Sequence, residues 1–351
     1  MSDVKHAPVC YPPPFPMQGR LPSRPGQIYQ NHRLQRDMED AYLGALRQAA
    51  GRWVQRPCCQ TMHITLCFDG TGNNLNNDLY ESTVAHPTNV VRLFRASIGA
   101  GHAGGTAHRG ENSGLTDAPG SGDSQCFKYY MPGVGTPFPE VGDLDYSLSG
   151  LGLGLYGEER INWALLMIID ALRRLLKQPR LDNAALRASV KAMGTRLGAE
   201  LAGYGNRSRE FYKQLDALRT PLRIALTQPS GGYPKLLGIK LFVYGFSRGA
   251  STARAFVSYL NQLLSGATPS LSLGDLSLPV SVEYLGLLDS VASVGLADIL
   301  PGATGHMGWA DGTQALPEGT LVKRCLHLVA SHEQRLSFPL ESIRRQGGEY
   351  P

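Results

Sequence analysis

The stretch that most constrains how this chain can fold is residues 238–256, where an apolar run leads into Gly-Phe-Ser-Arg-Gly and then into a helical pattern. The run fits a buried strand, the Gly-x-Ser-x-Gly fits a sharp turn, and residues 250–256 open an amphipathic helix. In such an elbow Ser247 stands at the end of the strand, while Gly245 and Gly249 relieve crowding between strand and helix. The pattern predicts Ser247 as a nucleophile, and an ordinary turn before a helix is the alternative.

Other segments carry the periodicity of strands and helices that alternate along the chain. The predicted strands are residues 63–68, 126–131, 282–288 and 321–330. The predicted helices are 87–94, with Thr88 as its expected N-cap, and 158–177. We therefore expect an α/β fold, α/β-hydrolase-like, with a mostly parallel central sheet and helices on both faces. Residues 99–123, rich in glycine and poor in apolar side chains, should form a long surface loop.

The domain organisation follows from composition. With 351 residues, of which 42% are hydrophobic, the chain can bury the core of one large α/β domain. Residues 1–60 are expected to form a proline-rich N-terminal arm with a short helix at 36–48, and residues 61–351 the α/β-hydrolase catalytic domain. Within that domain, residues 180–230 are helical in propensity and interrupted by glycines, which suggests a helical cap or insertion above the site.

Charge and composition disfavour several classes of function. The net charge of +5 is spread over 34 basic and 29 acidic residues without a basic block, so no nucleic-acid partner is expected. No run of about 20 apolar residues and no signal peptide is found, so we expect synthesis in the cytoplasm. The six cysteines are scattered and are interpreted as reduced thiols, without a metal site. Residues 152–157 match the dinucleotide fingerprint in letters only, because they follow a loop, and no cofactor is expected.

A second glycine-rich turn is predicted to lie near the elbow. The strand at 63–68 ends in Asp69-Gly70-Thr71-Gly72-Asn73-Asn74, and such a turn places backbone N–H groups at the ligand-binding edge of an open α/β sheet. Gly70 and Thr71 could therefore supply one donor of an oxyanion hole, and the N–H of Arg248 the other. A purely structural turn capped by Asp69 is the alternative.

An acid and a base are needed to activate Ser247, and this kind of fold carries them in the chain order serine, acid, histidine. Asp289 follows the predicted strand 282–288, where it could orient a histidine and stabilise its imidazolium form. A capping role at a turn is the alternative for Asp289. His327 lies within an apolar strand and is interpreted as a core or edge residue, and His332 follows that strand.

Several separated motifs, in a fixed order, are similar to those of one family. They lie at residues 68–74, 87–90, 129–136, 245–250, 286–292 and 332–335. Over about residues 62–338 they resemble the type VI secretion lipase effectors of the phospholipase class, which have an α/β-hydrolase catalytic domain. The resemblance implies an antibacterial phospholipase, with Ser247 as nucleophile and Asp289 as the triad acid. It also implies a phospholipid membrane as substrate, a secretion spike protein and an immunity protein as partners, and delivery into the periplasm of a target cell.

The catalytic histidine is the part of that pattern that this sequence lacks. In the family it lies in a His-Ser-Asp-Val-Gly-Gly segment beyond the His-Glu-x-Arg motif, and no such segment precedes Pro351. We therefore expect the C-terminal part of the domain, with the catalytic histidine, to be missing and the activity to be weak; His332 acting as a stand-in base is the alternative. We predict that Ser247 and Asp289 face a common pocket in which neither His327 nor His332 fills the place between them.

Two other functions stay open at this point. One is a catalytically weak or inactive hydrolase-like module that binds a secretion spike or an immunity protein. The other keeps the serine chemistry but takes a soluble ester as substrate, because the chain contains no obvious membrane-anchoring helix.

Overall fold

The computed structural model describes residues 59–104, 125–146, 156–194, 200–227, 235–291 and 316–330, together with the single residues 26, 29, 30, 33, 37 and 343. The predictions for the N-terminal arm, for the helix at 36–48 and for His332 lie outside the described ranges.

Helices and strands alternate along the described chain. In order they are β1 (Cys59–Phe68), the π-helix η2 (Asn77–Glu81), α2 (Asn89–Ala96), β2 (Ala100–Ala103), β3 (Cys126–Met131), the 3₁₀-helix η3 (Pro139–Val141), α4 (Gly157–Leu175), α5 (Asn183–Met193), α6 (Glu200–Asp216), α7 (Arg219–Thr227), β4 (Lys235–Phe246), α8 (Arg248–Leu263), β5 (Ser270–Leu273), β6 (Leu276–Leu288) and β7 (Cys325–Leu328).

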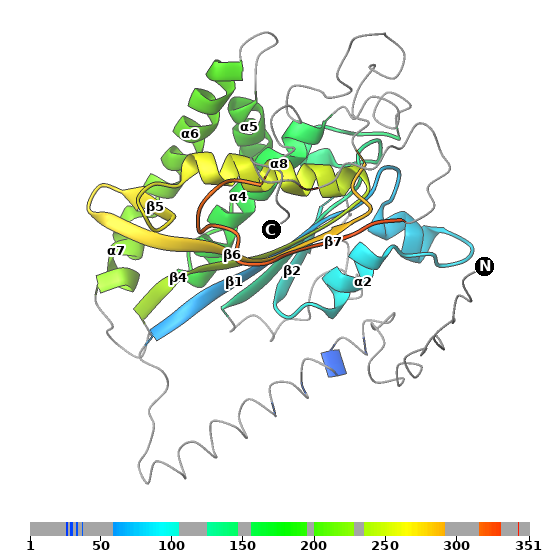
Figure 1. Ribbon diagram of the computed structural model, residues 1–351, viewed down its shortest axis with the longest axis horizontal. Coiled ribbons are helices and arrows are strands. Elements are labelled where there is room, and N and C mark those ends of the chain that lie inside the picture. The colour runs from blue at the N-terminus through cyan, green and yellow to red at the C-terminus, as the bar shows by residue number, and fades with distance from the viewer. Residues whose placement is uncertain are drawn as a thin grey trace, which may run out of the picture.

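The strands form one seven-stranded sheet that runs through the molecule (Figure 1). Its order is β2-β3-β1-β4-β6-β5, and β7 pairs with β6. The pairings are parallel except that of β5 with β6, which is antiparallel. Figure 1 shows α4 and α8 on one side of the sheet and α2 on the other. This mostly parallel sheet with helices on both faces is α/β-hydrolase-like, which confirms the fold class expected from the sequence.

The two faces of the sheet bury different cores, because successive side chains of a strand point to opposite faces. On β1, Ile64, Leu66 and Phe68 belong to a large core shared with α4 and α8. Cys67 of the same strand belongs to a smaller core with Val90, Val91 and Phe94 of α2. Burial on both faces explains why the central strands read as nearly continuous apolar runs.

Helix α2 begins where the sequence predicted, since Thr88 is its N-cap and accepts a hydrogen bond from Val91 N at 3.1 Å. Strands β1, β3, β4 and β6 and helix α4 also lie at their predicted positions. The strand expected over 321–330 is shorter, because only Cys325–Leu328 runs as a strand alongside β6.

Two strands were not predicted from the sequence. β2 falls within the expected surface loop 99–123, yet all four of its residues are buried beside β3. The loop expectation is therefore wrong for Ala100–Ala103, whose sequence Ala-Gly-His-Ala contains no apolar run to detect, and residues 105–123 lie outside the described ranges. β5 forms an antiparallel hairpin with β6, turning at Gly274, which has a φ of +67°.

The segment 180–230, expected to form a cap or insertion, is helical as predicted and consists of α5, α6 and α7. Its apolar faces supply Leu186, Phe211 and Leu222 to the same large core that α4 and α8 line. Arg223 of α7 pairs with Asp275 in the turn that precedes β6, which lies at the opposite end of that strand from the elbow. The described residues of these helices therefore contribute to the same core as α4 and α8, and a cap above the site stays a prediction.

Candidate active site

Ser247 occupies a strained turn between β4 and α8. Its backbone angles, φ 54° and ψ −127°, lie in a region that residues other than glycine rarely adopt. The flanking glycines permit very close contacts: a Cβ on Gly245 would lie 2.5 Å from the Gly249 carbonyl oxygen, and one on Gly249 would lie 2.3 Å from the Asp69 carbonyl oxygen. The strand, elbow and helix expected over residues 238–256 are therefore present.

Asp289 lies beside Ser247 because β4 and β6 are neighbouring parallel strands. Phe246 and Leu288, which precede these residues, are paired across the two strands, and the Ser247 N–H donates to the Leu288 carbonyl oxygen at 2.9 Å. Asp289 also has a positive φ, 49°, a conformation that aspartate tolerates better than most residues. The fold thus brings the predicted nucleophile and the predicted acid to one edge of the sheet.

The carboxylate of Asp289 is half-buried, and one of its oxygens already has a partner. Oδ1 accepts a hydrogen bond from Ala330 N, just beyond β7, at 3.3 Å. This contact joins the ends of β6 and β7 across 41 residues of sequence and is not a local cap of the turn that follows β6. Among the described residues Oδ2 makes no hydrogen bond, so it is available to orient a histidine.

His327 on β7 faces Ser290 instead of Ser247. Its Nε2 lies 3.3 Å from Ser290 N, so it accepts from that N–H and carries no proton itself. Burial, and then the charge of Arg254, lower the pKa of His327 more than Asp289 raises it, which favours a neutral ring. No hydrogen bond within the described part of the chain joins His327 to Ser247 or to Asp289, and His332 lies outside that part.

The turn after β1 packs directly against the elbow. A Cβ on Gly70 would lie 2.6 Å from the ring of Phe246, the residue before Ser247. On its other side the turn is held by the segment after β3, through hydrogen bonds from Asp69 N to Met131 O at 3.0 Å and from Gly72 N to Val134 O at 3.1 Å. The predicted oxyanion turn is therefore fixed between two neighbours.

The two predicted donors of this turn are not equivalent. The Gly70 N–H donates to Asp69 Oδ1 at 2.8 Å and is therefore already engaged. Thr71 makes no hydrogen bond with the described residues, and its Oγ1 is buried. Thr71 is therefore the residue of the turn with an uncommitted donor, and the oxyanion role of the turn stays a prediction.

A buried network around Asp69 holds the turn, and the sequence did not predict it. Asp69 Oδ2 accepts from the Tyr130 hydroxyl at 2.7 Å, and Thr88 Oγ1 lies 2.9 Å from both carboxylate oxygens. The Tyr130 hydroxyl accepts in turn from Leu75 N at 3.0 Å. Burial raises the pKa of Asp69 to about 7, although the hydrogen bonds from Tyr130, Gly70 and Thr88 oppose the rise. The available signal was the period of two, which places Tyr130 on the α2 face of β3.

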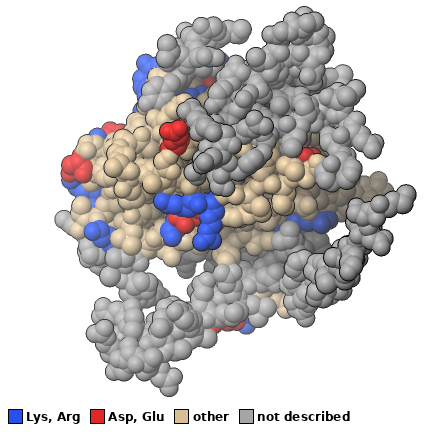
Figure 2. Space-filling view, viewed as in Figure 1, with Lys and Arg blue, Asp and Glu red and all other residues tan. Residues whose placement is uncertain are grey.

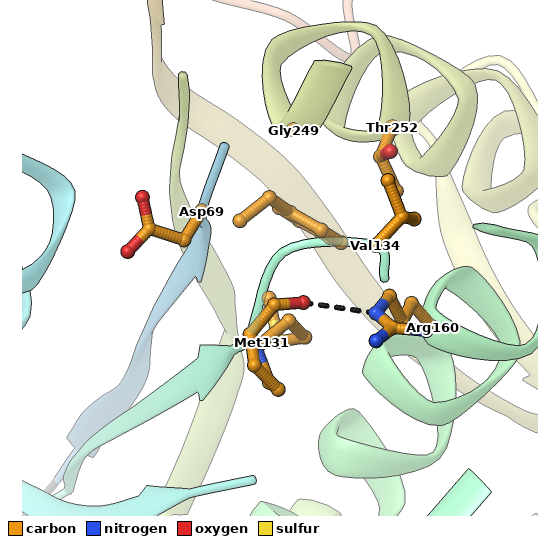
Figure 3. Close-up of a pocket in the computed structure, with 8 residues that line it drawn as sticks. Asp69, Met131, Val134, Arg160, Gly249 and Thr252 are labelled. Carbon is orange, nitrogen blue, oxygen red and sulfur yellow. Dashed lines mark hydrogen bonds between the residues drawn. The ribbon is translucent and has the colours of Figure 1, made fainter. Parts of the chain in front are cut away.

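A small, partly open pocket lies beside the turn and α8 (Figure 3). Its lining residues are Phe68, Asp69, Met131, Pro132, Val134, Arg160, Gly249 and Thr252. Buried Arg160 of α4 supports the segment after β3, donating through Nε to Pro132 O at 2.9 Å, dashed in Figure 3, and pairing with Asp143 at 2.9 Å. The Asp69 carboxylate points away from Arg160 in this view, toward its own network. Neither Ser247 nor Asp289 lines this pocket, so their common pocket stays a prediction.

The start of α8 favours an anion. Arg248 is its first residue, and the first turn contains no acidic side chain. Burial lowers the pKa of Arg248 to about 10, which leaves it charged at neutral pH. A cation at a helix N-terminus opposes the helix dipole, so an anion bound there would relieve an unfavourable interaction.

Other kinds of site have little support in the described residues. They contain no group of histidine, cysteine and carboxylate side chains that could hold a metal ion. Of the helices described, none is long and apolar enough to cross a membrane. On the face shown in Figure 2, basic and acidic side chains lie in small groups of mixed sign, and no broad basic patch is visible among the residues coloured there.

Fold and site geometry together define the class of protein: an α/β-hydrolase-like domain with a serine at a strand-to-helix elbow. The family model described as the catalytic domain of the Tle1-like phospholipase effectors of the type VI secretion system matches residues 62–265. The chain belongs to this family. A comparison with curated proteins found no match.

Two solved structures are similar to the chain. The first is a crystal structure of an uncharacterized protein from Pseudomonas aeruginosa, with 36% identity over 97% of this chain and a TM-score of 0.69. The match covers 43% of that protein, so the chain spans less than half of its length. The second is a Tle1 effector bound to the VgrG spike, with 18% identity over 82% of this chain and 48% of that one. Its TM-score of 0.32 is too low to support an argument.

Proposed function

We propose that this chain is the catalytic part of an antibacterial phospholipase that hydrolyses acyl esters of phospholipids. Ser247 attacks the ester carbonyl while a histidine oriented by Asp289 takes the proton from Oγ. The N–H of Arg248 and a donor of Thr71 bind the resulting oxyanion. The histidine then protonates the leaving alcohol, and water hydrolyses the acyl-enzyme. That histidine comes from outside the described residues, where His332 is a candidate stand-in.

The observation that carries this proposal is the strained backbone of Ser247. A non-glycine residue at φ 54° and ψ −127° costs free energy, on the order of 1–3 kcal/mol, and such strain collects at functional sites. An ordinary turn before a helix has no need of it. The strain supports a serine held out from the sheet edge for attack.

The decisive experiment measures fatty-acid release from phospholipid vesicles. Because the chain covers 43% of its solved relative, the assay uses both the 351-residue chain and the chain extended by its downstream coding region. Ser247→Ala should lower the rate by at least about 10³-fold. Ser258→Ala, on the same helix, is the matched control and should keep the rate within a factor of about two. Equal rates for wild type and Ser247→Ala would remove Ser247 from the mechanism.

A second candidate function is a binding module without turnover. The hydrogen bond of His327 favours this candidate. His327 lies on β7 and its Nε2 accepts from the Ser290 N–H, so among the described residues no histidine is hydrogen-bonded to Ser247. A fluorophosphonate probe tests this candidate, because labelling requires an activated serine. Efficient labelling at Ser247 of the 351-residue chain would exclude it.

Substrate form and partners follow from the family and are proposed with the activity. We expect hydrolysis of vesicle lipid to exceed that of a monomeric short-chain ester, and the reverse preference would favour a soluble ester. Delivery by type VI secretion implies a secretion spike protein and an immunity protein as partners, with action in the periplasm of the target cell. Co-purification with the spike and the product of the neighbouring gene would test both contacts.

A further inference from the structure

We propose that Asp69 is a positioning residue: together with Thr88 and Tyr130 it fixes the turn so that Thr71 presents its donor to the oxyanion at Ser247. The inference rests on the proposed function and assigns a role to three residues outside the predicted triad and oxyanion hole. Asp69, Thr88 and Tyr130 are called the anchor network below.

The anchor network joins three separate pieces of the fold at one carboxylate. Asp69 directly follows β1 and begins the turn that contains Gly70, Tyr130 belongs to β3, and Thr88 caps α2. Their donors lie 2.7 Å to 2.9 Å from the carboxylate oxygens, and Asp69 is 3% exposed. Four short contacts on a buried acceptor allow few alternative positions of the residue that carries it.

The position of the Asp69 side chain determines that of Thr71, because the two residues are separated only by Gly70. The hydrogen bond from Gly70 N to Asp69 Oδ1 fixes the peptide unit between these residues, and Thr71 follows one residue later. The turn has little room to move. Gly70 is in contact with Phe246, and Gly133 packs so closely that a Cβ on it would lie 1.8 Å from the Gly70 oxygen. The anchor network therefore determines where the uncommitted Thr71 donor lies relative to the elbow.

Placement of such a donor affects the transition state more than the bound substrate. An oxyanion donor contributes about 10²–10³-fold to kcat when it is held in place, and small displacements remove much of that contribution. Loss of the anchor network should therefore lower kcat while leaving KM nearly unchanged. A purely structural network would change stability without this selective effect on kcat.

Tyr130 and its sequence neighbour Tyr129 provide a matched pair of variants. Both are fully buried on β3, and each hydroxyl donates to a buried carboxylate: Tyr130 to Asp69 at 2.7 Å and Tyr129 to Asp170 at 2.9 Å. Tyr129 and Asp170 lie on the α4 face of the sheet, away from the turn. Tyr130→Phe and Tyr129→Phe should therefore lower the thermal midpoint similarly but differ in activity.

The experiment measures kcat, KM and thermal unfolding for wild type, Tyr130→Phe, Tyr129→Phe, Thr88→Val and Thr88→Ser, with phospholipid vesicles as substrate. We expect kcat to fall at least about tenfold in Tyr130→Phe and Thr88→Val, and to stay within about twofold in Tyr129→Phe. Thr88→Ser keeps the hydroxyl and should restore most of the rate. Equal kcat in Tyr130→Phe and Tyr129→Phe, or no rescue by Thr88→Ser, would overturn the inference.

The outcomes separate this inference from the proposed function. If wild-type hydrolysis does not depend on Ser247, the proposed function fails, and the positioning role fails with it. If hydrolysis depends on Ser247 but the anchor variants keep wild-type kcat, only the positioning role fails. Amide hydrogen exchange provides a second readout: Tyr130→Phe should speed exchange at Gly70 and Leu75, and Tyr129→Phe should not.

Discussion

The two sides of Ser247 are built very differently. Toward β1 and β3, the turn that carries Thr71 is enclosed by Gly133, Phe246 and the buried carboxylate of Asp69. Toward β6 and β7, Asp289 is half-buried. Its backbone N–H donates to Leu328 O at 2.7 Å, but among the described residues its carboxylate makes a single hydrogen bond, at 3.3 Å. The first side has its geometry set by close packing, whereas the second leaves an acceptor oxygen uncommitted.

The difference between the two sides fits the two catalytic roles proposed for them. A donor that stabilises an oxyanion must be held still before the reaction, so it belongs on the tightly packed side. An acid that orients a histidine needs a free oxygen, and Asp289 Oδ2 provides one among the described residues. Variants on each side of Ser247, and at one site remote from both, test this division of roles.

The largest effect is expected on the β6 side, from Asp289→Asn. The amide cannot orient and stabilise an imidazolium, so kcat should fall by about 10³–10⁴-fold. Thermal unfolding should hardly change, because Asp289 loses only one long hydrogen bond. Vesicle hydrolysis and a melting curve measure both. Asp275→Asn, at the exposed turn before β6, is the control, and full activity of Asp289→Asn would reduce Asp289 to a cap.

On the β1 and β3 side we expect Gly133→Ala to lower stability, in addition to any loss of kcat from displacement of the turn. The new Cβ would meet the Gly70 oxygen at 1.8 Å, so the turn must move, at a cost of about 3 kcal/mol. Denaturant unfolding measures this loss. Gly194→Ala is the matched control, since its nearest contact would be the Lys191 oxygen at 3.5 Å. Equal stability of the two variants would show that the turn shifts to accommodate the new Cβ at little cost in free energy.

The same side should also give a pH signature through Asp69. Its pKa is raised to about 7 in the folded protein, above the ordinary 3.8. Between these values the unfolded chain releases the proton and the folded protein keeps it, so stability falls as pH rises, by up to about 1.4 kcal/mol per pH unit.

Asp69→Asn removes this proton and isolates its effect. From pH 4 to pH 7 the unfolding free energy of wild type should decline relative to that of Asp69→Asn, and above pH 7 the difference should level off. Asp143 and Glu159, whose pKa values burial also raises, are present in both proteins and cancel in the difference. Asp78 does not cancel fully, because its charge contributes to the raised pKa of Asp69. A pH-independent difference would contradict the raised pKa.

The smallest effect is expected far from both sides, at Arg223 and Asp275. This pair is bidentate, with distances of 2.6 Å and 2.7 Å, but both side chains are exposed to solvent. Solvent screens such pairs, so Arg223→Ala should leave kcat and the thermal midpoint unchanged within error. A clear loss of activity would link the helices of residues 180–230 to the site.

The sequence alone determined the elements that depend on local pattern. Apolar runs and turn residues located β1, β3, β4 and β6, helical spacing located α4, and the cap at Thr88 located α2. The same signals placed Ser247 and Asp289 after strands, which is sufficient to bring both to one edge once the strands pair in parallel. The sequence of β2, Ala-Gly-His-Ala, contains no apolar run, so this buried strand was predicted as part of a loop.

Only the tertiary structure decided which groups meet across elements. Asp69, Thr88 and Tyr130 each have an adequate local explanation, as a turn residue, a helix cap and a strand residue. Their convergence depends on strand order and on the face to which each side chain points. The sequence also did not show that the Gly70 N–H donates to Asp69 Oδ1, or that His327 Nε2 accepts from Ser290 N. Both hydrogen bonds depend on three-dimensional distances, which no sequence periodicity encodes.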